Sequence, residues 1–226
     1  MKTAAIIPAY NEEKSLGDVL NVVVGHPLIG EVIVVDDGSK DSTSVVAKAH
    51  NVSRVITLNE NGGKGRALDI GVQNTEADII LFLDADLIGF RQIHVTNLIK
   101  PVIDKECEMT VGAIDRSKLS SALNRKLNRI ESPFSGMRAI KRNVWDIVPE
   151  AYKNKFYIET AITYLAKKKG IKVKPMVLTG VTHIIKEKKM GFWKGHWARW
   201  KMHWNIIWAS ILLRIKGPKK YGFSHQ

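Results

Sequence analysis

The sequence contains a single cysteine, Cys107, and has no long hydrophobic run. One cysteine excludes an internal disulfide and a cysteine metal cluster, and it is typical of a protein from a reducing compartment. The longest apolar stretch near the C-terminus, residues 206–213, includes Ser210 and is too short to cross a bilayer. The apolar segment after Met1 stops at Pro8, so no signal peptide is expected. These absences argue against a secreted, disulfide-stabilised or membrane-spanning protein.

Acidic residues are almost missing from the last quarter of the chain. Residues 167–226 contain 15 lysines and arginines and one acid, Glu187, so the net charge of +13 comes from this region. Such asymmetry indicates that the region contacts an anionic surface, either a membrane or a nucleic acid. No nucleic-acid-binding module is recognisable in the sequence, so we expect a membrane surface and no nucleic acid.

Two nucleotide-binding fingerprints are also missing. The glycine-rich stretch at residues 62–65, Gly-Gly-Lys-Gly, has neither the P-loop spacing nor the Gly-x-Gly-x-x-Gly spacing. Nucleoside triphosphate hydrolysis and dinucleotide binding therefore lose support. The glycines would still let the backbone approach a ligand closely, with Lys64 or Arg66 near a diphosphate. The alternative is a flexible loop that binds nothing.

Short apolar runs alternate with helical patterns along the first half of the chain. The predicted strands are residues 3–7, 31–35, 52–58 and 79–83. With 226 residues, 45% of them hydrophobic, the chain is long enough for one α/β domain with a substantial core. The alternation predicts a doubly wound, mostly parallel sheet with helices on both faces. Right-handed crossovers then bring the carboxyl ends of these strands to one edge, where ligands bind.

Two carboxylates, Asp84 and Asp86, follow the strand predicted at residues 79–83. An apolar run this short is typical of a strand buried on both faces, so the charges should emerge just past its carboxyl end. Two carboxylates so near each other repel unless a cation lies between them. A hard divalent ion such as Mg²⁺ or Mn²⁺ fits between two such carboxylates. The alternative is a helix N-cap followed by a solvated loop acid.

Five of the six tryptophans are spaced by four, three, four and four residues, at positions 193, 197, 200, 204 and 208. On a helix they lie on one face, with cationic residues off that face. Because tryptophan prefers the headgroup boundary of a bilayer, the pattern predicts an amphipathic helix lying in the membrane plane. The alternative is a face that packs on the main domain or on a second subunit, as in a homodimer. The predicted division is a main domain at 1–185 and a basic, Trp-rich segment at 186–226.

Four motifs together resemble those of family 2 glycosyltransferases, which have the GT-A fold. They are Pro-Ala-Tyr-Asn-Glu at 8–12, Val-Val-Asp-Asp-Gly-Ser-Lys-Asp-Ser-Thr at 34–43, Asn-Gly-Gly-Lys-Gly-Arg-Ala at 61–67 and Leu-Asp-Ala-Asp at 83–86. Each motif alone is weak, but the combination stands in the family's order and spacing. The nearest similarity is to polyprenyl-phosphate sugar synthases. Residues 135–142 also resemble the acceptor-side segment of these enzymes.

The resemblance implies a nucleotide-sugar site lined by Pro8, Tyr10, Glu12, Asp37, Lys64, Arg66 and Asp84. In this site Asp37 would hydrogen-bond the base, and Lys64 or Arg66 would lie near the ribose or the diphosphate. Asp84 and Asp86 would form an Asp-x-Asp metal site, with Asp86 as a direct ligand. The metal would act as a Lewis acid on the departing nucleoside diphosphate. The implied acceptor-side residues are Ser135, Gly136 and Arg138.

The sequence departs from the family pattern at two positions. Many inverting members carry a Glu-Asp pair whose second acid is the catalytic base, but here Glu159 is followed by Thr160. Either Glu159 is the base or none is needed, because a phosphate acceptor is already ionised. His183 stands where some retaining GT-A enzymes place a third metal ligand, and imidazole commonly binds Mn²⁺-like ions. The alternative is a structural histidine.

The leading hypothesis is a metal-dependent hexosyltransferase that moves a sugar from a nucleoside-diphosphate sugar to a membrane-lipid acceptor such as polyprenyl phosphate. It would be cytoplasmic and peripheral on the inner face of the cell membrane. A second hypothesis, resembling glucosyl-3-phosphoglycerate synthase, keeps this chemistry with a small soluble acceptor and uses the tryptophan face for dimerisation. A third hypothesis is a non-catalytic, membrane-attached nucleotide-binding module.

Overall fold

The computed structural model describes residues 1–114, 135–153 and 158–183, all of which belong to one compact unit. The predicted basic, Trp-rich segment 186–226 lies outside the described residues. Its amphipathic helix and the domain boundary at residue 185 therefore remain predictions. Among the described helices, none combines the length and the hydropathy that a bilayer crossing requires.

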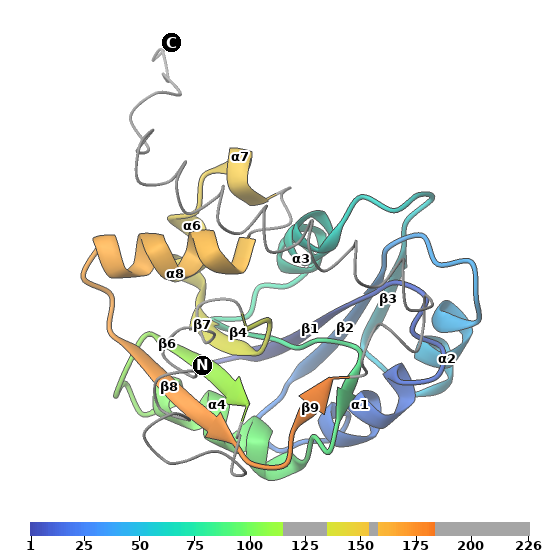
Figure 1. Cartoon of the computed structure of the whole chain (residues 1–226), viewed down its shortest axis with the longest axis horizontal. Helices are drawn as coiled ribbons and strands as arrows, with labels where there is room; N and C mark the ends of the chain where they lie inside the picture. Colours follow the sequence, from blue (N-terminus) through green and yellow to red (C-terminus); the bar gives the residue numbers. More distant parts are fainter. Residues whose placement is uncertain (115–134, 154–157, 184–226) are drawn as a thin grey trace, which may run out of the picture. The chain divides into compact units, whose positions relative to one another are not determined.

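The centre of the fold is a seven-stranded mixed sheet with the strand order β3-β2-β1-β4-β7-β6-β8 (Figure 1). Its strands are β1 (Thr3–Ala9), β2 (Glu31–Asp36), β3 (Arg54–Thr57), β4 (Ile79–Phe82), β6 (Met109–Ile114), β7 (Arg138–Lys141) and β8 (Val173–Leu178). Strands β1 to β4 are parallel to their neighbours in this group, and β8 is parallel to β6. Strand β7 is antiparallel to both β4 and β6. The predicted α/β fold with a mostly parallel sheet is confirmed.

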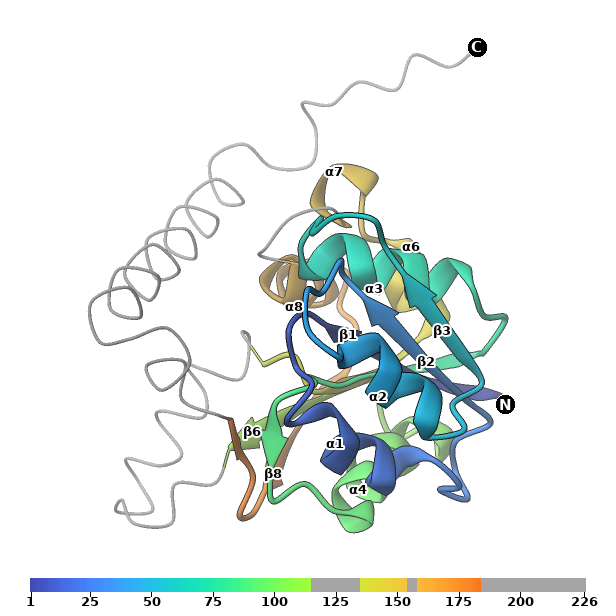
Figure 2. The ribbon, with the colours of Figure 1, turned by 90° about the vertical axis from the view of Figure 1, so that its right-hand side faces the viewer.

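Helices cover both faces of the sheet, as Figure 2 shows. They are α1 (Leu16–Val23), α2 (Thr43–Ala49), α3 (Lys64–Gln73), α4 (Gln92–Ile103), α6 (Arg142–Asp146), α7 (Glu150–Lys153) and α8 (Ile158–Lys168). Successive strand residues point to opposite faces, so Ile7 joins the core under α1, α2 and α4, whereas Ile6 joins the core under α3, α6 and α8. Both isoleucines are fully buried. Burial on both faces forces the charged residues to the ends of the strands.

Helix α3 lies unusually close to β1 at Gly71. A Cβ atom at this position would collide with Cγ2 of Ile6 in the centre of the sheet. Because glycine has no side chain, helix α3 can pack directly against strand β1. This contact fixes the axis of α3, whose first residue, Lys64, is thereby held at the carboxyl edge of the sheet.

A second, two-stranded sheet pairs β5 (Leu87–Ile88) with β9 (Thr182–His183) in antiparallel fashion. Gly89, with a φ of 71°, packs its Cα against the carbonyl oxygen of Gly180. A side chain at Gly89 would meet this oxygen, so the close approach depends on glycine. The pairing joins the chain after the Asp84–Asp86 motif to the chain before residue 184. The sequence does not predict this ribbon.

Candidate active site

The loops after β1 and β2 are joined by hydrogen bonds at the carboxyl edge of the sheet. The backbone N–H of Asn11 donates to Ser39 Oγ at 2.9 Å, and Asn11 Oδ1 accepts the backbone N–H of Lys40 at 2.9 Å. Asn11 has a φ of 54°, in the left-handed region that asparagine tolerates better than most residues. The two loops therefore form one connected wall beside the sheet edge.

Three of the predicted nucleotide-site residues lie in or just after β1. Pro8 is half-buried within the strand, whereas Tyr10 is 41% exposed. Glu12 accepts a hydrogen bond from Ser15 Oγ at 2.6 Å. An aromatic ring exposed at the carboxyl edge is suited to stack on a nucleotide base. The contact of these three residues with a nucleotide remains a prediction.

The Asp37 carboxylate holds the glycine-rich loop before α3. Its Oδ1 accepts the backbone N–H of Gly62 and its Oδ2 accepts that of Gly63, both at 2.8 Å. Hydrogen bonds to a charged group contribute roughly 1.5–3 kcal/mol each, and Asp37 is buried. Gly63 has a φ of 89°, which glycine adopts without strain. The hydrogen bond of Asp37 to the base remains a prediction. The structure shows that Asp37 orients the backbone before Lys64.

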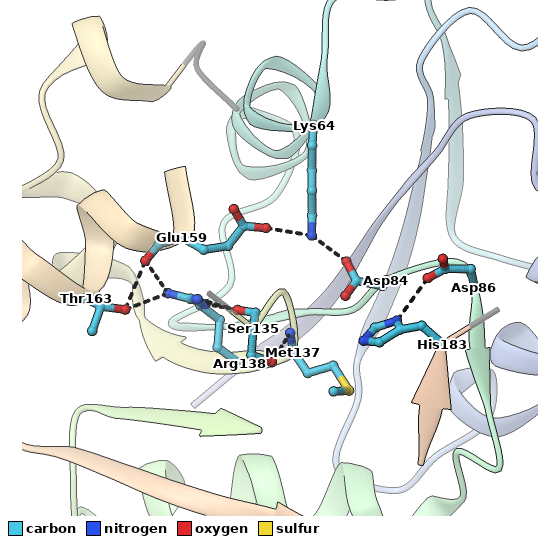
Figure 3. A network of polar contacts seen from close by, with 9 residues as sticks. All are labelled: Lys64, Asp84, Asp86, Ser135, Met137, Arg138, Glu159, Thr163 and His183. Atoms are coloured by element: carbon cyan, nitrogen blue, oxygen red, sulfur yellow. Dashed lines mark hydrogen bonds and ion pairs between the residues drawn. The ribbon is translucent and has the colours of Figure 1, made fainter. Parts of the chain in front are cut away.

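Lys64 lies between two carboxylates from distant parts of the chain (Figure 3). Its Nζ forms a short ion pair with Asp84 and lies 2.6 Å from Oε1 of Glu159. Burial alone would lower the pKa of Lys64, but the two negative charges outweigh burial and raise it. Burial would likewise raise the pKa of Asp84, but the Lys64 charge outweighs burial and lowers it. Lys64 and Asp84 are therefore both charged, and the ammonium group contacts both carboxylates.

Asp84, Asp86 and His183 each bring one possible ligand atom to within 4.8 Å of the other two. His183 Nδ1 lies 3.2 Å from Asp86 Oδ1, because the β5–β9 pairing places His183 opposite Leu87. Burial lowers the pKa of His183, but the hydrogen bond to Asp86 and the charges of both acids raise it overall. The potential at the imidazole is thus negative. Two carboxylates and one imidazole fit Mn²⁺ well and are compatible with Mg²⁺.

Replacing His183 by glutamine should weaken the binding of Mn²⁺ by at least roughly tenfold, because even outer-shell partners of metal ligands contribute 10–100-fold. The affinity is measured by the electron paramagnetic resonance signal of free Mn²⁺ in a titration of the full chain with a nucleoside diphosphate present. His50→Gln is the matched control, since His50 ends α2 and its Nδ1 contacts the Val46 carbonyl, away from the acids. Equal affinities in wild type and His183→Gln would assign His183 a structural role.

The segment before β7 lies against the Lys64–Asp84 ion pair. The antiparallel register pairs Phe82 with Arg138, and its continuation by two residues brings Gly136 opposite Asp84. A Cβ atom at Gly136 would collide with the Asp84 carboxylate and the Lys64 ammonium group. The predicted acceptor-side residue Gly136 is therefore in direct contact with the predicted donor side.

Arg138 is fully buried and connects β7 to α8. Its Nη1 donates to the Glu159 carbonyl at 3.0 Å and to Thr163 Oγ1 at 3.3 Å, and its Nε donates to the Ser135 carbonyl at 3.2 Å. Burial lowers the pKa of Arg138 to about 10, which still leaves the guanidinium group charged at neutral pH. These contacts give Arg138 and Ser135 a part in positioning Glu159, and a direct acceptor contact remains a prediction.

Several of the predicted residues share one polar network in the structure. Those that share the polar network of Figure 3 are Lys64, Asp84, Asp86, Ser135, Arg138, Glu159 and His183, with Gly136 packed against it. Arg66 lies apart, because its side chain is 43% exposed and its Nη1 is 4.0 Å from Glu60. Of the two cations proposed for the diphosphate, Lys64 is the one that contacts the acids.

Thr163 belongs to the network but was not predicted from the sequence. Thr163 Oγ1 donates to the Glu159 carbonyl at 2.9 Å and accepts a bond from Arg138. The signal available in the sequence was its spacing of four residues from Glu159, which on a helix such as α8 places both on one face. A threonine bonded to the carbonyl four residues earlier is common in helices, so the spacing alone is weak.

The sequence matches the family model described as glycosyl transferase family 2 over residues 4–165. Dolichyl-phosphate beta-glucosyltransferase of Homo sapiens is 39% identical over 98 residues, which cover 37% of this chain and 30% of that protein. Undecaprenyl-phosphate 4-deoxy-4-formamido-L-arabinose transferase of Shewanella sediminis is 30% identical over 175 residues, which cover 68% of this chain and 52% of that protein. The chain thus matches between 30% and 52% of the length of these two relatives.

The fold is similar to that of glucosyl-3-phosphoglycerate synthase from Mycobacterium tuberculosis. The crystal structure of that protein with Mn²⁺, UDP-glucose and phosphoglyceric acid matches with a TM-score of 0.69 and 25% identity. The match covers 81% of this chain and 71% of the other. The likeness confirms the GT-A-type fold expected from the sequence motifs.

Proposed function

Because the chain belongs to glycosyl transferase family 2, we propose that it transfers a hexosyl group from a nucleoside-diphosphate sugar to a lipid-phosphate acceptor. The observation that carries this proposal is the meeting of Asp84, Asp86 and His183 beside the Lys64 ammonium group. This cluster combines a donor set for a divalent cation with a positive charge for a diphosphate. Two of the relatives are named for a lipid phosphate, which supports the acceptor class.

Different site residues would bind different parts of the donor. Asp84, Asp86 and His183 would hold Mn²⁺ or Mg²⁺, and the bound ion would supply Lewis-acid stabilisation of the departing nucleoside diphosphate. Lys64 would add a second positive charge toward the diphosphate. Asp37 keeps the backbone before Lys64 in place through Gly62 and Gly63. The connected loops after β1 and β2 would receive the nucleoside.

The surroundings of Glu159 favour an acceptor that is already ionised. The Glu159 carboxylate is engaged by Lys64 at 2.6 Å, so it would have to break this ion pair to accept a proton. A phosphate oxygen needs no general base, because it carries its negative charge at neutral pH. The geometry therefore supports a phosphate acceptor over an alcohol. The tryptophan face predicted in segment 186–226 is a reason to expect that acceptor at a membrane surface.

Replacing Glu159 by glutamine should lower kcat/KM by less than about tenfold with a polyprenyl phosphate acceptor, since no proton must be removed. General-base catalysis is worth about 10²–10⁴-fold, so a hydroxyl acceptor would show a loss of that size. The measurement is the ratio of kcat/KM between variant and wild type for each acceptor. Glu106→Gln is the matched control, because Glu106 pairs with Lys174 on the surface. A loss above about 100-fold with polyprenyl phosphate would make Glu159 the base.

A second candidate acceptor is a small soluble phosphorylated hydroxy acid. The structural likeness to a synthase that was crystallised with phosphoglyceric acid favours it. In this case the predicted tryptophan face would serve a homodimer instead of a membrane. The donor side of the site would be the same under both proposals.

A transfer assay with two acceptors tests the proposal. The full chain is incubated with radiolabelled nucleotide sugars, Mn²⁺ or Mg²⁺, and either polyprenyl phosphate in anionic vesicles or 3-phosphoglycerate. We expect label in the lipid extract and co-sedimentation of the chain with the vesicles. Label in the aqueous acceptor alone would favour the second candidate. A rise in melting temperature with a nucleoside diphosphate and metal, but no transfer to either acceptor, would indicate the non-catalytic module.

A further inference from the structure

The Lys64 ammonium group and the predicted metal ion need the same carboxylate. Lys64 Nζ pairs with Oδ1 of Asp84, and Asp84 also belongs to the three-residue ligand set with Asp86 and His183. In Figure 3 Asp84 stands between Lys64 on one side and His183 on the other. Asp84 is therefore the residue at which the two cations would meet.

The two cations cannot both bind Asp84 without strong repulsion. The side chains of Asp84 and Glu159 are only 16% and 12% exposed, so water screens charges weakly between them. An ion on the second oxygen of Asp84 would still lie within a few ångströms of the ammonium group. The ammonium group therefore opposes occupancy of the metal site as long as Lys64 stays at Asp84.

Lys64 can move without a change in the main chain. Its backbone is fixed at the start of α3 by the bonds from Gly62 and Gly63 to Asp37, but its side chain has four rotatable methylene groups. On the side away from Asp84 the ammonium already contacts Glu159. A diphosphate bound in front of the glycine loop would offer a stronger anion than the Asp84 carboxylate does.

We propose that Lys64 is an internal counter-ion of Asp84 that a nucleoside diphosphate removes, so that the divalent cation and the nucleotide bind as a pair. The proposal rests on the donor site proposed above and adds an order of events to it. Before the donor arrives, the ammonium neutralises Asp84 and opposes binding of the free cation. When the diphosphate draws Lys64 away, Asp84 becomes available as a ligand. By linkage, the cation must strengthen nucleotide binding by the same factor.

The test measures Mn²⁺ binding to the full chain, without nucleotide and then with UDP, by the paramagnetic resonance signal of free Mn²⁺. Lys64→Met should bind Mn²⁺ alone at least tenfold more tightly than wild type does. The factor by which UDP strengthens Mn²⁺ binding should fall at least tenfold in this variant. The double variant Lys64→Met/Glu159→Gln keeps the net charge and should show the same gain, which also serves if the single variant fails to fold.

Arg66→Met is the control for the binding of Mn²⁺ alone, since it removes an equal charge two residues further along α3 without touching Asp84. Its affinity for Mn²⁺ should stay within about threefold of wild type, because an exposed charge is screened. The proposal is overturned if neither Lys64 variant gains affinity, or if Arg66→Met gains as much. Failure of wild type to bind Mn²⁺ even with UDP would instead overturn the donor site itself.

Discussion

Replacing Asp86 by asparagine should lower kcat/KM for sugar transfer by about 10²–10⁴-fold. Lewis-acid stabilisation by a bound metal is worth several kcal/mol, and each 1.36 kcal/mol corresponds to a factor of ten in rate. Asparagine keeps the size of the side chain but loses the negative charge that would hold the cation. Asp86 also accepts the contact with His183, so the substitution disturbs two of the three candidate ligands.

The measurement is the initial rate of transfer from a nucleotide sugar over a range of Mn²⁺ concentrations. Asp104→Asn is the matched control, because Asp104 pairs with Lys100 at the end of α4 and is remote from the acids. We expect the control to keep its rate within about twofold, as is usual for an exposed pair. An Asp86→Asn protein with undiminished, metal-dependent transfer would remove the metal site from the proposal.

Replacing Arg138 by methionine should lower the free energy of unfolding by about 3–5 kcal/mol, the usual cost of breaking a buried charge network. The guanidinium group is fully buried and donates to the carbonyls of Ser135 and Glu159. A buried carbonyl that loses its donor costs about 1–3 kcal/mol. Because these bonds join β7 to α8, the variant should also lose precise placement of Glu159.

Urea denaturation followed by circular dichroism measures the loss, with Arg138→Lys and Arg54→Met beside Arg138→Met. Lysine keeps the charge but lacks the planar fork, so Arg138→Lys should fall between wild type and Arg138→Met. Arg54 donates to Asn74 on the surface, and Arg54→Met should change stability by less than about 1 kcal/mol. A change below 1 kcal/mol in Arg138→Met would show that its carbonyl partners find other donors.

The two acids after β4 could be predicted from local sequence. The later site residues were expected only from the family resemblance, and their contacts were not expected. The buried run before Asp84 is enough to place both acids at the carboxyl edge, because charges are expelled from a strand covered on both faces. The pairing of Lys64 with Asp84 and Glu159 joins residues that are 20 and 95 positions apart. No hydrophobic periodicity in the sequence indicates a contact between residues so far apart in the chain.

Strand direction and very short strands also escaped the sequence reasoning. Nothing in the four residues of β7 indicates that this strand runs antiparallel to β4. That direction is what brings Gly136 against Asp84. The ribbon of β5 and β9 has two residues on each side, which is too short for alternation to be visible.

The ribbon formed by β5 and β9 makes the position of His183 in the site easy to disrupt. His183 reaches Asp86 only while a ladder of two residue pairs stays closed, whereas Asp84 and Asp86 follow a strand in the centre of the large sheet. Short ladders at the surface open with much smaller free energies than central strands. The imidazole therefore belongs to a part of the molecule that opens locally at a much lower free-energy cost than unfolding of the large sheet. Retention of a bound ion would follow the lifetime of this ladder and not the global stability of the fold.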